Sequence, residues 1–176
     1  MPSLKIEELK EIQSLYNYNI YEKFIETGTY MGSTIDNIKD YFKNIYTIEL
    51  NENLFNYCCK KFENDKNIKC VKGDSSIKLK DILENNKDEI VFFLDGHYSS
   101  GETSRSDKDV PLLEELEIIN KYYKNKGIII IDDLRLFETK YNEDWSNISK
   151  KKIIDKLDNI KFSLTMEKSD KFIIYL

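Results

Sequence analysis

The sequence predicts an α/β protein in which helices cover both faces of a mostly parallel central sheet. Short apolar segments alternate with helical patterns along the chain, which is typical of parallel strands joined by crossover helices. Two of these segments, Ile90–Leu94 and Ile128–Ile131, contain no polar residue, as expected for strands buried on both faces. The segment FIETGTYMGST at residues 24–34 reads as a strand end, a glycine-containing turn and the start of a helix.

The remaining elements follow from the spacing of apolar residues. Leucine and isoleucine recur every three or four positions over Ser3–Leu15, which predicts an amphipathic helix there. Apolar runs predict the strands Lys23–Glu26, Ile45–Glu49, Ile68–Lys72, Ile90–Leu94 and Ile128–Ile131. Helical periodicity predicts connecting helices over Ser33–Phe42, Asn51–Phe62 and Val110–Lys124, and another that begins at Ser75 and runs through Ile77, Ile82 and Leu83. We expect Ser33 and Thr34 to cap the first of these helices.

The C-terminal part departs from the strict alternation of strand and helix. Helical spacing predicts a helix over Trp145–Leu157. Two final strands, Lys161–Met166 and Lys171–Tyr175, are joined by a short polar segment, so we expect a β-hairpin. Because we find no repeat and no linker, residues 1–176 are expected to form a single domain.

Composition narrows the class of protein. The chain has 176 residues and a formal net charge of −5, which makes a general nucleic-acid binder unlikely. No apolar run is long enough to span a bilayer, and the N-terminus does not have the pattern of a signal peptide. We therefore expect a soluble cytoplasmic protein without membrane association.

The turn after the first strand is the most specific signal in the chain. Its glycines, Gly28 and Gly32, are spaced G-x-x-x-G, whereas dinucleotide-binding turns have G-x-G-x-x-G. Glu26, just before the turn, would repel a pyrophosphate and suits a ligand with a cationic end. S-adenosylmethionine is such a ligand, because it carries an ammonium and a sulfonium and no phosphate. The alternative is a tight strand-to-helix connection that binds nothing.

Carboxylates follow five of the predicted strands, at the edge where open α/β sheets bind ligands. They are Glu26, Glu49, Asp74, Asp95 and the pair Asp132–Asp133. Glu49 is placed to accept the two hydroxyls of a ribose, or to cap the helix that starts near Asn51. Asp74 is placed to accept the exocyclic amine of adenine, or to cap the helix that begins at Ser75.

Asp95, Asp132 and Asp133 end two strands that we expect to be neighbours. Three converging carboxylates form an oxygen-rich site suited to a hard cation such as Mg²⁺. The alternative is that these side chains cap helices and accept hydrogen bonds in loops.

Five segments together resemble the class I S-adenosylmethionine-dependent methyltransferases, and more narrowly the metal-dependent O-methyltransferases of catechols and caffeoyl thioesters. ETGTYMGST is similar to their cofactor motif E-x-G-x-[YF]-x-G-x-[ST]. The other segments are YTIELNENL, VKGDSSIKL, FFLDGHY and IIIIDDLRLF, and the resemblance covers roughly residues 22 to 137. It implies a Rossmann-like methyltransferase fold.

The resemblance also implies roles for individual residues. The positions that it assigns to the cofactor are Glu26, Gly28, Thr29, Tyr30, Gly32, Ser33, Glu49, Asp74, Ser75 and Asp95. The positions that it assigns to a metal are Asp95, Asp132 and Asp133, the last of which is usually asparagine in that family. Tyr98 stands where the family often has a catalytic lysine, and His97 directly precedes it.

These residues lead to a mechanistic hypothesis. The chain is expected to transfer a methyl group from S-adenosylmethionine to a hydroxyl of a small molecule such as a sugar, phenol or natural product. Asp95 and His97 are the candidate catalytic residues, with His97 as general base or, alternatively, as a loop histidine with a local hydrogen bond. The competing hypotheses are a non-catalytic cofactor-binding module and another transferase on the same fold. A homodimer would be ordinary for an enzyme of this size.

Overall fold

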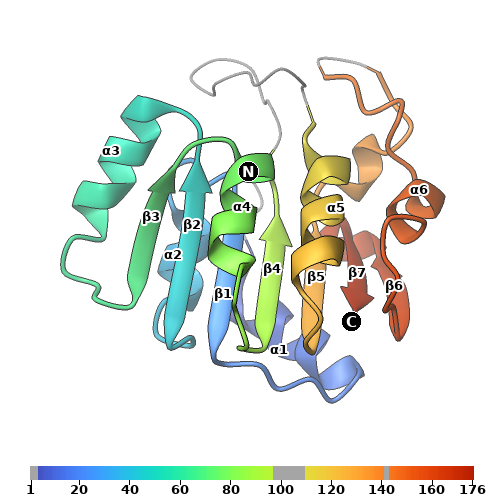
Figure 1. The fold of residues 1–176 in the computed structure, drawn as a ribbon, viewed down its shortest axis with the longest axis horizontal. Helices are drawn as coiled ribbons and strands as arrows, with labels where there is room; N and C mark the ends of the chain where they lie inside the picture. Colours follow the sequence, from blue (N-terminus) through green and yellow to red (C-terminus); the bar gives the residue numbers. More distant parts are fainter. Residues whose placement is uncertain (1–3, 97–109, 141–142) are drawn as a thin grey trace.

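The computed structural model describes residues 4–96, 110–140 and 143–176, and it contains one seven-stranded sheet (Figure 1). The strand order is β3-β2-β1-β4-β5-β7-β6. The strands are β1 (Lys23–Thr27), β2 (Asn44–Glu49), β3 (Ile68–Lys72), β4 (Ile90–Leu94), β5 (Gly127–Ile131), β6 (Phe162–Met166) and β7 (Lys171–Tyr175). Neighbours from β3 to β5 pair in parallel, and β7 pairs antiparallel with both β5 and β6. The predicted parallel sheet and C-terminal hairpin are therefore confirmed.

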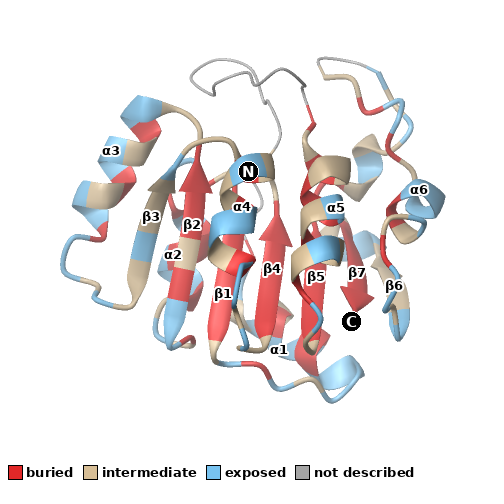
Figure 2. Cartoon of the chain, in the orientation of Figure 1, coloured by how far each residue is buried: buried red, intermediate tan, exposed pale blue. Residues whose placement is uncertain are grey.

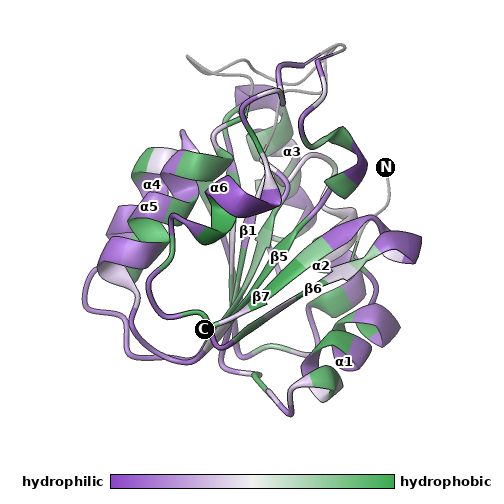
Figure 3. Cartoon of the chain, turned by 90° about the vertical axis from the view of Figure 1, so that its right-hand side faces the viewer, coloured by the Kyte–Doolittle hydropathy of each residue, from purple (hydrophilic) through white to green (hydrophobic). Residues whose placement is uncertain are grey.

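Helices cover both faces of this sheet, as Figure 3 shows from the side. They are α1 (Ile6–Leu15), α2 (Ser33–Ile38), α3 (Glu52–Lys61), α4 (Ser75–Leu83), α5 (Leu112–Tyr122) and α6 (Lys150–Ile154). One apolar core joins α4, α5 and α6 to the sheet, and a second joins α1, α2 and α3 to its other face. Every residue of β1, β4, β5 and β7 is buried (Figure 2). Burial on both faces explains why the segments of β4 and β5 contain no polar side chain. No helix in the described part of the chain is long and apolar enough to cross a membrane.

The register of the sheet aligns the ends of the central strands. Thr27, Leu94 and Ile131 lie in one row across β1, β4 and β5. The hydrogen-bond ladder continues one residue further, because Asp95 N donates to Thr27 O at 3.2 Å and Asp132 N donates to Leu94 O at 3.2 Å. The residues directly after the strands are thereby held at one edge of the sheet.

Several helices differ from their predicted extents, including α1, which begins only at Ile6. The predicted helix over Trp145–Leu157 is wrong in its first part, since α6 begins only after Ser149, whose hydroxyl accepts a hydrogen bond from Lys152 N. The helix predicted to end at Phe42 ends at Ile38. The helix predicted to begin at Val110 begins at Leu112.

The capping of α2 also corrects the sequence analysis. Its N-cap residue is Gly32 with φ +71°, and no side chain caps it. Ser33 and Thr34 belong to the helix itself. The backbone of the turn therefore starts this helix, because Gly32 supplies the left-handed conformation that side-chain-bearing residues rarely adopt.

Candidate cofactor-binding site

Gly28 brings the turn after β1 against the end of β4. Its φ is +79°, and a Cβ atom at this position would lie 2.3 Å from the backbone oxygen of Asp95. A Cβ atom on Gly32 would lie 2.7 Å from Cε2 of Phe62, which comes from the end of α3. Both glycines of the motif are therefore required by close approach as well as by backbone conformation.

Glu26 is a buried carboxyl group held by threonines. Glu26 belongs to β1 and is only 2 % exposed. Thr47 Oγ1 donates to Glu26 Oε2 at 2.6 Å, and the Thr47 and Thr29 hydroxyls are 2.5 Å apart. Burial raises the pKa of Glu26 to about 8, and nearby Asp95 acts in the same direction, while hydrogen bonds from Thr47 and Thr34 oppose the increase. Among the described residues, the groups that shift this pKa are hydroxyl donors and acidic side chains, so no protein cation offsets the cost of ionising Glu26.

Thr34 and Thr47 are site residues that the sequence analysis missed. Thr47 lies in a strand whose last residues are otherwise apolar or acidic, and a buried threonine at such a position is a weak signal of a polar partner. The sequence predicts Thr34 only as a helix cap. Its contribution to Glu26 depends on how the turn folds back over β1, which spacing along the chain does not reveal.

Glu49 lies beside this turn and holds it to β2. Glu49 Oε2 accepts a hydrogen bond from Tyr30 N at 2.9 Å, and Oε1 accepts one from Asn51 N at 2.8 Å. Burial raises the pKa of Glu49, against the effect of these donors. The cap of α3 is Asn51, whose Oδ1 accepts from the backbone of Asn53 and Leu54. The alternative in which Glu49 caps that helix is therefore wrong, and its carboxylate is held by backbone donors just after β2.

Asp74 and Ser75 begin α4 on the other side of the edge. Asp74 Oδ1 accepts hydrogen bonds from Ser76 N at 2.9 Å and from Ser76 Oγ at 2.6 Å, so the capping alternative is confirmed. The Ser75 hydroxyl is hydrogen-bonded to Glu115 of α5. Glu115 is 1 % exposed, and burial raises the pKa of this carboxyl to about 7. It is a second buried acid at this edge that the sequence analysis missed.

The three predicted metal ligands do follow neighbouring strands, yet two of them contact cationic side chains. Lys171 Nζ donates to Asp132 Oδ1 at 3.2 Å, and Arg135 Nη1 donates to Asp133 Oδ1 at 2.5 Å. Asp133 has φ +58°, so its backbone turns away into the short helix Leu134–Leu136. Within residues 4–96, 110–140 and 143–176 we find no group of three or more acidic, cysteine or histidine side chains arranged to hold a metal ion. The residues present do not fit the predicted Mg²⁺ site.

Asp95 lies between the two halves of the edge. It follows β4, and its charge raises the pKa of both Glu26 and Asp132. Ser33 and Tyr30 are exposed on the outer side of the turn. His97, the candidate base, lies outside the described residues, as does Tyr98.

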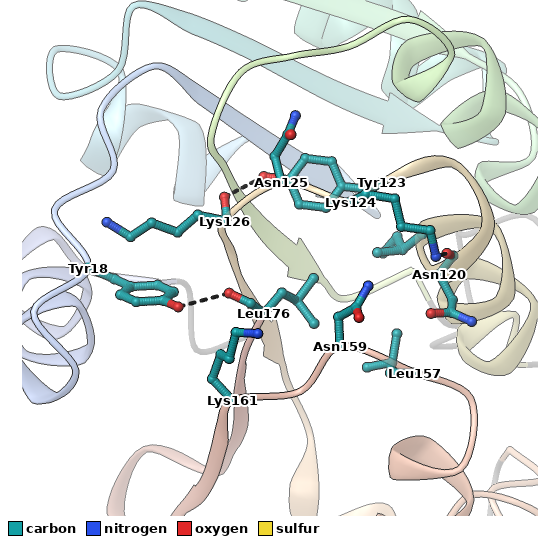
Figure 4. Close-up of a pocket in the computed structure, with 11 residues that line it drawn as sticks. Tyr18, Asn120, Tyr123, Lys124, Asn125, Lys126, Leu157, Asn159, Lys161 and Leu176 are labelled. Carbon is teal, nitrogen blue, oxygen red and sulfur yellow. Dashed lines mark hydrogen bonds between the residues drawn. The ribbon is translucent and has the colours of Figure 1, made fainter.

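A cavity of about 320 Å³ lies at the opposite edge of the sheet (Figure 4). Its lining comes from the segments before β1, β5 and β6 and from the ends of α5 and β7. None of the predicted site residues that the structure describes lines this cavity, so it is separate from the candidate cofactor site. Lys126 lies here over the ring of Tyr18, 4.4 Å from its centroid, and Tyr18 Oη donates to Leu176 O at 2.9 Å.

Comparison with known proteins identifies the fold. No family model matches the sequence, and no curated protein matches it. Solved structures match over nearly the whole chain. An O-methyltransferase from Bacillus cereus in complex with SAH has a TM-score of 0.64 at 16 % identity, covering 99 % of this chain and 82 % of that one. A putative O-methyltransferase from Klebsiella pneumoniae has a TM-score of 0.66 at 12 % identity, covering 98 % and 80 %.

A third similar structure is a SAM-dependent methyltransferase from Aquifex aeolicus, with a TM-score of 0.57 at 17 % identity, covering 93 % of this chain and 86 % of that one. The predicted Rossmann-like methyltransferase fold is thereby confirmed. At these identities the likeness concerns the fold alone.

Proposed function

We propose that the chain binds S-adenosylmethionine at the edge formed by β1, β2 and β4 and transfers its methyl group to a hydroxyl of a small molecule. The observation that carries the proposal is the buried Glu26 carboxyl next to Gly28. Among the described residues, this carboxyl accepts hydrogen bonds from threonine hydroxyls and contacts no cationic side chain. A ligand ammonium would supply the compensating charge, and the close approach of the Gly28 turn to the Asp95 backbone brings the ends of β1 and β4 together beside this carboxyl.

Charge supports this cofactor over a phosphate-bearing one. Glu26, Glu49 and Asp95 all lie at this edge, so a pyrophosphate would be repelled. Glu49 keeps a fixed position through two backbone donors and is suited to accept the ribose hydroxyls, since each carboxylate oxygen has a second acceptor site. Asp74 is committed to the α4 cap by one oxygen, and its predicted contact with adenine remains a proposal.

The mechanism assigned to the protein is binding and alignment. When bound, the cofactor supplies a methyl group on a sulfonium that reacts by in-line displacement. Glu26 would hold the ammonium of its methionine part and Glu49 the hydroxyls of its ribose, and fixing the reactants in one geometry supplies much of the rate. His97 is proposed to remove the proton of the acceptor hydroxyl. Acceptors remain a sugar, a phenol or a natural product, and a homodimer stays a prediction.

Calorimetric titration with S-adenosylhomocysteine tests the cofactor site. We expect micromolar binding to the wild type and at least a tenfold loss in Glu26→Gln, because the amide keeps the shape and removes the charge. The matched control is Glu22→Gln, which lies just before β1 at the other end of the strand and pairs with Lys43. Equal affinity in all three proteins would contradict the assignment of Glu26.

Turnover separates the enzyme from its alternatives. Methyl transfer to any hydroxyl acceptor would exclude a non-catalytic cofactor-binding module. Binding of S-adenosylhomocysteine without turnover in a broad acceptor screen would favour that module. Absence of binding would point to a different ligand and another transferase on this fold.

A further inference from the structure

Lys171 is a fully buried lysine, which is rare unless its charge is compensated. It is the first residue of β7 and is 1 % exposed. The antiparallel pairing of β7 with β5 places it beside the residue that follows β5, which is Asp132. Its position at the cofactor edge is therefore fixed by the sheet.

Three oxygen atoms from three separate segments surround the Lys171 ammonium. Ser169 O lies 3.0 Å from Nζ, Asp132 Oδ1 lies 3.2 Å away, and Glu8 Oε1 of α1 lies 3.6 Å away. Glu8 Oε1 is buried and accepts no hydrogen bond in the described structure. The ammonium also lies 5.9 Å from the centroid of the Phe93 ring. These groups form a cation site whose cation belongs to the chain.

The distances suit an ammonium. Mg²⁺ requires oxygen ligands at about 2.0–2.1 Å, and an N–H···O contact requires about 2.7–3.2 Å. Two of the three oxygens lie in the second range. A divalent ion added beside Lys171 would also be repelled by it, and the neighbouring Asp133 contacts the Arg135 guanidinium.

We propose that the Lys171 ammonium is the resident cation of this edge, taking the position where the carboxylate pattern predicts a divalent metal. Cofactor binding by this chain then needs no metal, and this part of the inference rests on the proposed function. Lys171 is a positioning residue, because it joins α1 to the end of β5 through Glu8 and Asp132.

The first test is metal binding by the wild-type protein, with Mn²⁺ as the probe and water proton relaxation as the readout. We expect no stoichiometric binding in the millimolar range. Mn²⁺ binding that disappears in Asp132→Asn would overturn the proposal. This readout does not depend on any cofactor or acceptor.

The second test removes the built-in cation. Lys171→Met keeps most of the side-chain volume, and we expect it to gain Mn²⁺ affinity at least tenfold over the wild type. Lys171→Arg should behave like the wild type. Lys168→Met is the control, because Lys168 is exposed in the nearby turn Glu167–Ser169. A folded Lys171→Met that gains no Mn²⁺ affinity would overturn the proposal, and the wild-type titration decides alone where this variant does not fold.

Titration of the wild type with S-adenosylhomocysteine in EDTA and then in Mg²⁺ separates the two proposals. Equal affinity in the two buffers supports the metal-independent site, and a tenfold gain with Mg²⁺ contradicts it. No binding in either buffer would reject the proposed function, while the Mn²⁺ experiments would still decide the role of Lys171.

Discussion

Acidic side chains lie in both halves of the sheet edge that the carboxyl ends of the parallel strands form. Their hydrogen-bond and ion-pair partners differ between the two halves. At the ends of β1 and β2, Glu26 and Glu49 accept hydrogen bonds from hydroxyls and backbone N–H groups. Just after β5, Asp132 contacts Lys171, which is the first residue of β7, and Asp133 contacts Arg135. In the first half, no cationic side chain of the described residues contacts Glu26 or Glu49, so a cationic ligand would be needed to stabilise the ionised form of Glu26. In the second half, these lysine and arginine side chains neutralise the carboxylates.

Placing a side chain on Gly28 should have the largest effect on the first half. In Gly28→Ala the new Cβ would lie 2.3 Å from the Asp95 backbone oxygen, at φ +79°. The left-handed backbone costs about 1–2 kcal/mol and the overlap adds about 1–3 kcal/mol. We expect a loss of about 3 kcal/mol in the free energy of unfolding, measured by urea denaturation. Ser33→Ala, on the exposed side of the same turn, should change it by less than about 0.5 kcal/mol. An unaffected Gly28→Ala would disprove the close approach.

The buried charge of Glu26 should make stability depend on pH. Its pKa is raised from 4.5 to about 8, so the folded state favours the protonated form, and stability is lost as pH rises from about 4.5 to about 8. Glu26→Gln removes this pH-dependent loss of stability, because the amide does not ionise. We expect the variant to be more stable than the wild type at pH 9 by an amount on the order of 2 to 4 kcal/mol.

The difference between the two proteins should shrink toward pH 5, where the wild-type carboxyl is neutral. Glu115 also has a raised pKa, of about 7, but it titrates in both proteins and cancels in the comparison. Urea denaturation at pH 5, 7 and 9 measures the effect. A constant difference across this range would mean that Glu26 titrates near its ordinary pKa and that burial does not favour its protonated form.

Substitution of Asp74 should have the smallest effect on stability. It tests whether Asp74 only caps α4 or also contacts the ligand. Asp74→Ala removes the acceptor for Ser76 N, which costs about 1 kcal/mol of stability. Asp74→Ser should restore most of it, since serine also caps helices. If Asp74 contacts adenine, both variants lose affinity for S-adenosylhomocysteine. Unchanged affinity in Asp74→Ser would assign Asp74 to the cap alone.

Much of the fold was predictable because the central strands are buried on both faces. Runs such as Ile90–Leu94 have no other stable placement in a chain of alternating helices and strands, and their bounds are confirmed. Helix ends were less predictable. The start of α6 depends on the Ser149 cap and on tertiary packing of Trp145, which the helical spacing of apolar residues does not reveal.

The convergence of carboxylates at one edge was also predictable, because parallel strands end together. Their partners were not. Lys171 is 39 positions from Asp132 in the chain and meets it only through the antiparallel pairing of β7 with β5. Arg135 is two positions from Asp133, so the segment DDLR did contain a local signal for that ion pair.

The central claim is that Glu26 binds the ammonium group of a cationic ligand. Proton release on binding tests this claim most directly. Calorimetry of S-adenosylhomocysteine at pH 7, in two buffers with different ionisation enthalpies, counts the protons released. Because the Glu26 carboxyl is mostly protonated at this pH, an ammonium beside it should release between about half and one proton. Glu26→Gln should release none from this position. Tight binding with the same proton count in both proteins would contradict the account.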